Sequence, residues 1–196
     1  MKSNWLQKSL LLSALCFSAS QVYADWQLEA DQSHIHFVSI KKAQVGEVHT
    51  FKQLSGSIDE SGKAAITIQL DSVETQVPIR NERMREMLFE TARFPSAQLT
   101  TAVDTAVLNK LKPGQVVHQD AKIEVALHGK TTSLSAELQI IGLQKGQFSV
   151  VTAKPVMLYV GDFDLAVGVK KLQEVAKLPS ISLAVPGTVN LVFSKK

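Results

Sequence analysis

Residues 122–142 read KIEVALHGKTTSLSAELQIIG, and the fold class can be inferred from their pattern. Apolar and polar side chains alternate before and after the turn residues 128–130, with apolar residues at Ile123, Val125, Leu127, Leu134, Ala136, Leu138 and Ile140. A period of two is typical of a β-strand that buries one face. Two such strands joined by a short turn predict an antiparallel hairpin.

The same alternation extends over most of the chain. Turn residues separate the alternating segments at 60–62, 112–114 and 144–146, at hairpin spacing rather than the spacing of βαβ units. We expect strands at residues 26–30, 33–42, 46–58, 63–71, 96–105, 116–128, 131–142, 147–158 and 180–193. Eight or nine antiparallel strands predict a mainly β fold that closes into a barrel. A barrel of this size is either filled by its own side chains or holds one small ligand, and the pattern fits both.

One helix is predicted near residues 79–91, directly after Pro78. Its apolar side is formed by a stripe with helical spacing, Met84, Met87, Leu88 and Thr91. Phe94-Pro95 ends the segment and returns the chain to extended structure. A weaker helical pattern covers residues 164–177.

The N-terminus has the pattern of a secretory signal peptide. Lys2 and Lys8 precede an apolar run over residues 10–19, and residues 22–24 fit a cleavage site after Ala24. We therefore expect a signal peptide at residues 1–24, one mature domain at 25–196, and a location in a bacterial periplasm. The single cysteine, Cys16, lies within the signal, so the mature chain has no thiol and no disulfide.

Charge and motif content exclude several classes of function. Residues 1–24 contain two lysines and no acidic residue, which leaves 19 basic and 18 acidic residues and a net charge near +1. Nucleic-acid binding has no electrostatic basis at this charge. The sequence has no Gly-x-Ser-x-Gly nucleophile motif, and its carboxylates near strand ends fit turns and caps, so no enzyme and no cofactor is predicted.

Two polar groups leave alternatives open. His34 and His36 share one face of their strand, and pairing with the next strand at an odd residue sum would bring His49 to the same face. Three clustered imidazoles would suit zinc or copper. The alternative is that the three are ordinary surface or hydrogen-bonded histidines, and we predict no metal. Arg80, Arg83 and Arg85 would either bind an anionic headgroup or pair with nearby glutamates to fasten the helix.

Several motifs, in order along the chain, resemble those of the YceI-like family. They are FVSIK (37–41), GEVHTFKQLSG (46–56), SVET (72–75), IRNERMREMLF (79–89), FP (94–95), VALHGKT (125–131), GDFDL (161–165) and GV (168–169). The resemblance covers nearly all of residues 26–193. It implies an exported protein with a lipocalin-like antiparallel barrel, a helix near one end, and a polyisoprenoid such as a quinone-type lipid inside the barrel.

The chain also departs from the family pattern. The family's histidine-serine and lysine-histidine pairs are replaced here by Ser33-His34 and Lys41-Lys42, so recognition of a polar headgroup does not carry over. Binding of an isoprenoid tail needs only apolar walls, because each buried CH₂ contributes about 0.8 kcal/mol. The candidate ligand-binding wall residues are Phe37, Phe51, Leu54, Ile66, Ile68, Val73, Leu88, Phe89, Val125, Leu127, Phe148 and Phe163.

These observations predict a periplasmic protein that binds an isoprenoid, quinone-like or similar apolar lipid and carries or stores it without covalent chemistry. The alternative is an envelope stress-response or interaction protein whose barrel is filled by side chains. Both predict the same apolar core, because alternation does not tell which face of each strand points inward. Transient contact with a membrane or membrane protein, and formation of a homodimer, are left open by the sequence.

Overall fold

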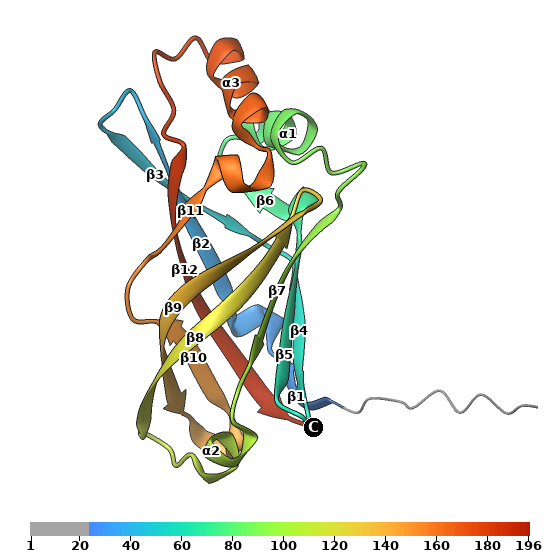
Figure 1. Ribbon diagram of the computed structural model, residues 1–196, viewed down its shortest axis with the longest axis vertical. Helices are drawn as coiled ribbons and strands as arrows, with labels where there is room; N and C mark the ends of the chain where they lie inside the picture. The colour runs from blue at the N-terminus through green and yellow to red at the C-terminus, as the bar shows by residue number, and fades with distance from the viewer. Residues whose placement is uncertain (1–23) are drawn as a thin grey trace, which may run out of the picture.

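The computed structural model describes residues 24–196, which form a tall barrel with helices at both ends (Figure 1). The predicted signal peptide, residues 1–24, lies outside the described residues except for Ala24. The strands are β1 (Ala24–Leu28), β2 (His34–Lys41), β3 (Val45–Phe51), β4 (Leu54–Asp59), β5 (Lys63–Gln69), β6 (Val73–Glu74), β7 (Ser96–Ala102), β8 (Val116–Leu127), β9 (Lys130–Gly142), β10 (Phe148–Thr152), β11 (Val156–Tyr159) and β12 (Ala184–Lys195).

Eight antiparallel strands close the barrel, in the order β1, β4, β5, β7, β8, β9, β10 and β12, and β12 returns to β1. The remaining strands, β2, β3, β6 and β11, extend the sheet beyond this closed part. Strand β12 pairs with β2 and β11, and β3 pairs with β2 and β6. The prediction of a mainly β antiparallel barrel of about eight strands is confirmed.

The single strands predicted at 46–58 and 147–158 are wrong, because each is interrupted. Between β3 and β4 the backbone N–H groups of Lys52 and Gln53 turn toward Ser72, donating to its carbonyl and its hydroxyl. Between β10 and β11, Pro155 lacks the N–H that a ladder needs. The segments on the two sides of a break then have different partners: β3 pairs with β2 and β6, whereas β4 pairs with β1 and β5.

The hairpin predicted around residues 122–142 is confirmed. Leu127 pairs with Lys130 at its end, and Ile123 pairs with Leu134 further down. The two turn residues both have positive φ, 52° at His128 and 77° at Gly129, as a type I′ turn requires. A side chain at Gly129 would also crowd the ring of Phe94, with a Cβ only 3.1 Å from it.

The helical segment predicted at 79–91 exists, but it has two parts. The α-helix α1 covers Pro78–Arg83, and a π-helical turn follows over Met84–Leu88. In that turn the Phe89 amide donates to the Met84 carbonyl, five residues back, at 2.9 Å. The consecutive side chains of Leu88 and Phe89, at the end of this wider turn, are both buried.

Two further helices complete the described part of the chain. Helix α3 (Ala166–Val175) confirms the weaker pattern over 164–177. Helix α2 (Thr105–Lys110) was not predicted from the sequence, although Asp104 caps it by accepting a hydrogen bond from the Ala106 amide at 2.8 Å. Within residues 24–196, none of the helices has the length and apolar character needed to cross a membrane.

Helix α3 packs directly on the π-helical turn, at the end of the barrel opposite the C-terminus (Figure 1). The contact depends on Gly168. A Cβ at this position would lie 2.7 Å from the Met87 carbonyl oxygen and 2.9 Å from the Leu88 Cα, so any larger residue would separate the two backbones. Together α1, the π-helical turn and α3 cover the upper end of the barrel.

Candidate functional site

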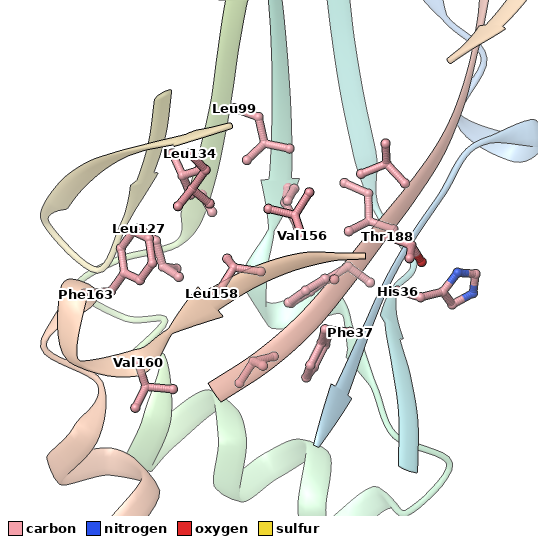
Figure 2. Close-up of a pocket in the computed structure, with 18 of the residues that line it drawn as sticks. His36, Phe37, Leu99, Leu127, Leu134, Val156, Leu158, Val160, Phe163 and Thr188 are labelled. Carbon is pink, nitrogen blue, oxygen red and sulfur yellow. The ribbon is translucent and has the colours of Figure 1, made fainter. Parts of the chain in front are cut away.

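An apolar cavity of about 200 Å³ lies in the upper half of the barrel, below these helices. Figure 2 shows Phe37, Leu127, Leu158 and Phe163 gathered around it, from four different parts of the fold. Of the predicted wall residues, the structure places these eight on the cavity: Phe37, Phe51, Ile68, Leu88, Phe89, Val125, Leu127 and Phe163.

The other four predicted residues lie elsewhere. Ile66 and Phe148 line a second, smaller cavity of about 70 Å³ in the lower half of the barrel. Leu54 and Val73 line neither of these two cavities and are instead buried in the core. Leu54 stands directly after the break between β3 and β4, and Val73 directly after the 3-10 turn Leu70–Ser72.

A large part of the wall was not predicted from the sequence. Strands β11 and β12 contribute two apolar residues each, the 3-10 turn after β11 contributes one, and β7 contributes two more; these residues are Val156, Leu158, Val185, Val189, Val160, Ala97 and Leu99. Alternation at Val156, Leu158 and Val160 was visible in the sequence. It could not show which face of the strand points inward.

The two cavities share part of their walls. Leu99, Ile123 and Val189 line both of them, each from a different strand. Apart from these three side chains, the walls above and below are formed by separate sets of mainly apolar residues. These three shared side chains form a partition between the upper and the lower cavity.

The histidine cluster that an odd register would have produced is not formed. Strand β2 pairs Phe37 with His49 and His36 with Thr50, so His49 faces the interior while His34 and His36 lie exposed on the outer face, their ring centroids 6.0 Å apart. Within residues 24–196, no three histidine, cysteine or acidic side chains converge as a metal site would require.

A polar cluster lies instead on the inner face of the β2–β3 hairpin. Ser39 Oγ is 2.8 Å from His49 Nε2, and His49 is only 3% exposed. Further along the hairpin, Glu47 forms ion pairs with Lys41 and Arg80, each at 2.8 Å. The hydrogen bond from Lys41 lowers the pKa of Glu47, and burial lowers the pKa of His49, with the positive charge of Arg80 adding to that effect.

A second polar network attaches the start of α1 to β6. Asn81 Oδ1 accepts hydrogen bonds from the Thr75 amide, at 2.9 Å, and from its hydroxyl, at 2.5 Å. Glu74 accepts from Asn81 Nδ2 at 3.1 Å and pairs with Lys52 at 2.6 Å. Arg80, one of the three arginines considered above, forms its ion pair with Glu47 of β3 and not with a glutamate near it in the sequence.

This network predicts a loss of stability in acid. The hydrogen bond from Lys52, with those from Asn81 and the Gln76 amide, lowers the pKa of Glu74 to about 2 from an ordinary value of 4.5. Because the folded value is the lower one, the contribution of Glu74 is complete above pH 4.5 and disappears as the pH falls from there toward 2.

Urea unfolding at pH 6 and pH 3 tests this expectation. The free energy of unfolding should fall less between the two pH values in Glu74→Gln than in the wild-type protein. A matched control is Glu124→Gln on the exposed surface of β8, which should behave as wild type. An identical pH response in wild type and Glu74→Gln would contradict the prediction.

Comparison with known proteins agrees with this architecture. A solved structure of a polyisoprenoid-binding domain from Saccharophagus degradans has 34% sequence identity and a TM-score of 0.87, and the match covers 89% of this chain and 100% of that one. Burkholderia cenocepacia BcnA, at 14% identity and a TM-score of 0.64, shares the fold over 84% of this chain and 98% of its own.

A YceI protein from Campylobacter jejuni also shares the fold, with 18% identity, a TM-score of 0.52, and coverage of 80% of this chain and 90% of its own. A search of curated proteins finds no match. The model of the YceI-like domain matches residues 26–193, which is nearly every residue of the barrel described above. The chain therefore belongs to the YceI-like family.

Proposed function

We propose that this protein binds a lipid with an isoprenoid or similar apolar tail in the upper cavity, and carries or stores it in a bacterial periplasm. The observation that carries the proposal is the cavity itself, because its wall is built almost wholly from aliphatic and aromatic side chains. Such a wall can bury the apolar surface of a long tail, and it requires no hydrogen bond to that tail. The relative from Saccharophagus degradans, a polyisoprenoid-binding domain, supports the same class of ligand.

The proposal includes no covalent chemistry. The Ser39–His49 distance of 2.8 Å matches that of a hydrolase dyad, but the arrangement around it does not. Ser39 lies within a regular strand rather than on a sharp turn, and Glu47 is engaged by Lys41 and Arg80 rather than by His49 Nδ1. The pair is better suited to binding than to nucleophilic attack.

The periplasmic location rests on the signal-peptide pattern of residues 1–24. Cleavage after Ala24 would leave Asp25 as the first residue, directly at the start of the barrel, since β1 spans Ala24–Leu28. N-terminal sequencing of protein from a periplasmic extract tests this point, and a mature chain that retains residues before Asp25 would refute it.

Mass spectrometry of protein purified from its own cells tests the ligand. Native spectra should show a mass above that of the polypeptide, and denaturing spectra should release it as an apolar lipid in a stoichiometric amount. Polypeptide mass alone, repeated after incubation with isoprenoid alcohols and quinones, would contradict the proposal. That result would favour the alternative, an envelope stress-response or interaction protein.

The partition between the two cavities predicts a limit on tail length. Leu99→Ala should join the cavities and raise the affinity for solanesol relative to that for the much shorter farnesol, while destabilising the fold by about 2–4 kcal/mol. The control is Leu158→Ala, because Leu158 lines the upper cavity alone. Competition against a fluorescent lipid measures both affinities, and an equal ratio in Leu99→Ala and wild type would contradict the prediction.

A further inference from the structure

The inner face of the β2–β3 hairpin changes from apolar to polar within one strand repeat. On β2, Phe37 lines the cavity and Ser39 follows two residues later; on β3, Phe51 lines the cavity and His49 precedes it by two. These four residues point to the same side, because alternate residues of a strand share a face. The polar cluster is therefore the direct continuation of the cavity wall.

Aromatic contacts join the cluster to the cavity. The Phe37 ring lies 5.2 Å from the His49 ring and 5.3 Å from the Phe51 ring, measured between centroids. Phe51 in turn lies 5.8 Å from Phe89, and all three phenylalanines line the cavity. The half-buried Phe37 ring thus contacts His49 on one side and lines the cavity on the other, so it links the polar cluster to the cavity wall.

Buried polar atoms of the cluster are unsatisfied. His49 Nδ1 and Arg80 Nε have no hydrogen-bond partner among residues 24–196, although both are shielded from water. Whichever ring nitrogen carries the proton, the contact with Ser39 uses Nε2 and leaves Nδ1 unmatched. An unpaired buried polar atom costs free energy, so a ligand atom that satisfied it would be held strongly.

Charge in the cluster is largely compensated before any ligand arrives. The carboxylate of Glu47 already engages both Lys41 and Arg80, and burial lowers the pKa of His49, which favours the neutral imidazole. A multiply charged group would lose its hydration and meet at most one uncompensated positive charge. A neutral hydroxyl or carbonyl would be desolvated at much lower cost.

From these observations we propose that Ser39, His49 and Arg80 form a headgroup subsite that takes a neutral, oxygen-bearing head of the lipid whose tail occupies the cavity. This assignment rests on the proposed function. The head inserts past Phe37 and hydrogen-bonds to His49 Nδ1 and Arg80 Nε, which fixes the orientation of the lipid with its tail toward the lower half of the barrel.

The test compares ligands that share one tail: geranylgeraniol, the hydrocarbon that lacks its hydroxyl, and geranylgeranyl diphosphate. Each competes with a fluorescent lipid for the wild-type protein. We expect the alcohol to bind about tenfold more tightly than the hydrocarbon, and the diphosphate to bind no more tightly than the alcohol. A diphosphate that binds most tightly would overturn the subsite in favour of an anion site.

Variants then assign the preference to its residues. His49→Leu should remove the advantage of the alcohol over the hydrocarbon, whereas His49→Gln, which keeps a polar group, should retain part of it. His34→Leu on the outer face of β2 is the matched control and should behave as wild type. Thermal unfolding of each variant checks that the barrel is intact.

The outcomes separate the two proposals. If neither the alcohol nor the hydrocarbon binds the wild-type protein, the lipid-binding function itself is wrong and the subsite falls with it. If both bind but their ratio is the same in wild type, His49→Leu and His49→Gln, the cavity binds lipid and the headgroup subsite is wrong.

Discussion

Replacing Phe37 and Phe51 together by lysine is expected to abolish lipid binding. The two rings face each other across β2 and β3 on the wall of the upper cavity. Two ammonium groups at these positions would either enter an apolar space or bring water into it, and the affinity for an isoprenoid alcohol should fall by about a hundredfold or more. Competition against a fluorescent lipid measures the loss.

The matched control uses the other side of the same two strands. Val38 and Val48 form a cross-strand pair on the outer face, where Val48 is 62% exposed. The double variant Val38→Lys with Val48→Lys carries the same added charge and should bind lipid as the wild type does. Circular dichroism establishes whether both double variants are folded.

A second variant keeps this prediction testable if the inward lysines prevent folding. Ala97 lines the cavity from β7, and Ala97→Phe would fill part of the space without adding charge. It should also weaken binding strongly, whereas Ala102→Phe on the exposed end of the same strand should not. Unchanged binding in both the lysine and the phenylalanine variants would exclude the cavity as the lipid site.

Trp26→Ala is expected to be the most destabilising single substitution in the lower half of the barrel. Trp26 is 2% exposed and meets Phe148 edge to face at 6.1 Å, and Phe148 stacks on Phe193 at 5.3 Å. Truncation of a buried tryptophan costs about 3–5 kcal/mol. Urea unfolding monitored by circular dichroism should show this loss.

The control for Trp26 removes a contact on its surface instead of the ring. Lys195 Nζ lies 5.3 Å from the centroid of the indole ring, and Lys195→Ala should cost less than about 1 kcal/mol. If Trp26→Ala also lowered the free energy of unfolding by less than about 1 kcal/mol, the aromatic group of Trp26, Phe148 and Phe193 would not be a main source of the stability of the barrel.

Sequence patterns predicted the barrel because strand alternation and turn residues are local signals. The hairpin around His128 and Gly129 is an example, since both the strands and the type I′ turn follow from neighbouring residues. The break between β3 and β4 depends on contacts far along the chain, the hydrogen bonds from Lys52 and Gln53 to Ser72. Such contacts leave no periodic trace in the sequence.

The candidate site was less predictable than the fold for the same reason. Apolar composition identified Phe37 and Phe51, but the register of β2 against β3 decided that His49 faces inward and His36 outward. A shift of one residue would have reversed those faces. Ser39, Glu47 and Arg80 could be predicted as individual polar residues, yet only the folded chain shows that they meet.

The last strand also determines when the cavity can first exist. Strand β12 pairs with β1 and β2 at the beginning of the chain and with β10 and β11 near its end. During synthesis and any passage through a translocation channel, residues 24–183 can form hairpins but cannot close a barrel. Under the proposed function, enclosure of a lipid therefore has to wait until β12 has joined the sheet, which makes docking of this strand the step that creates the binding site.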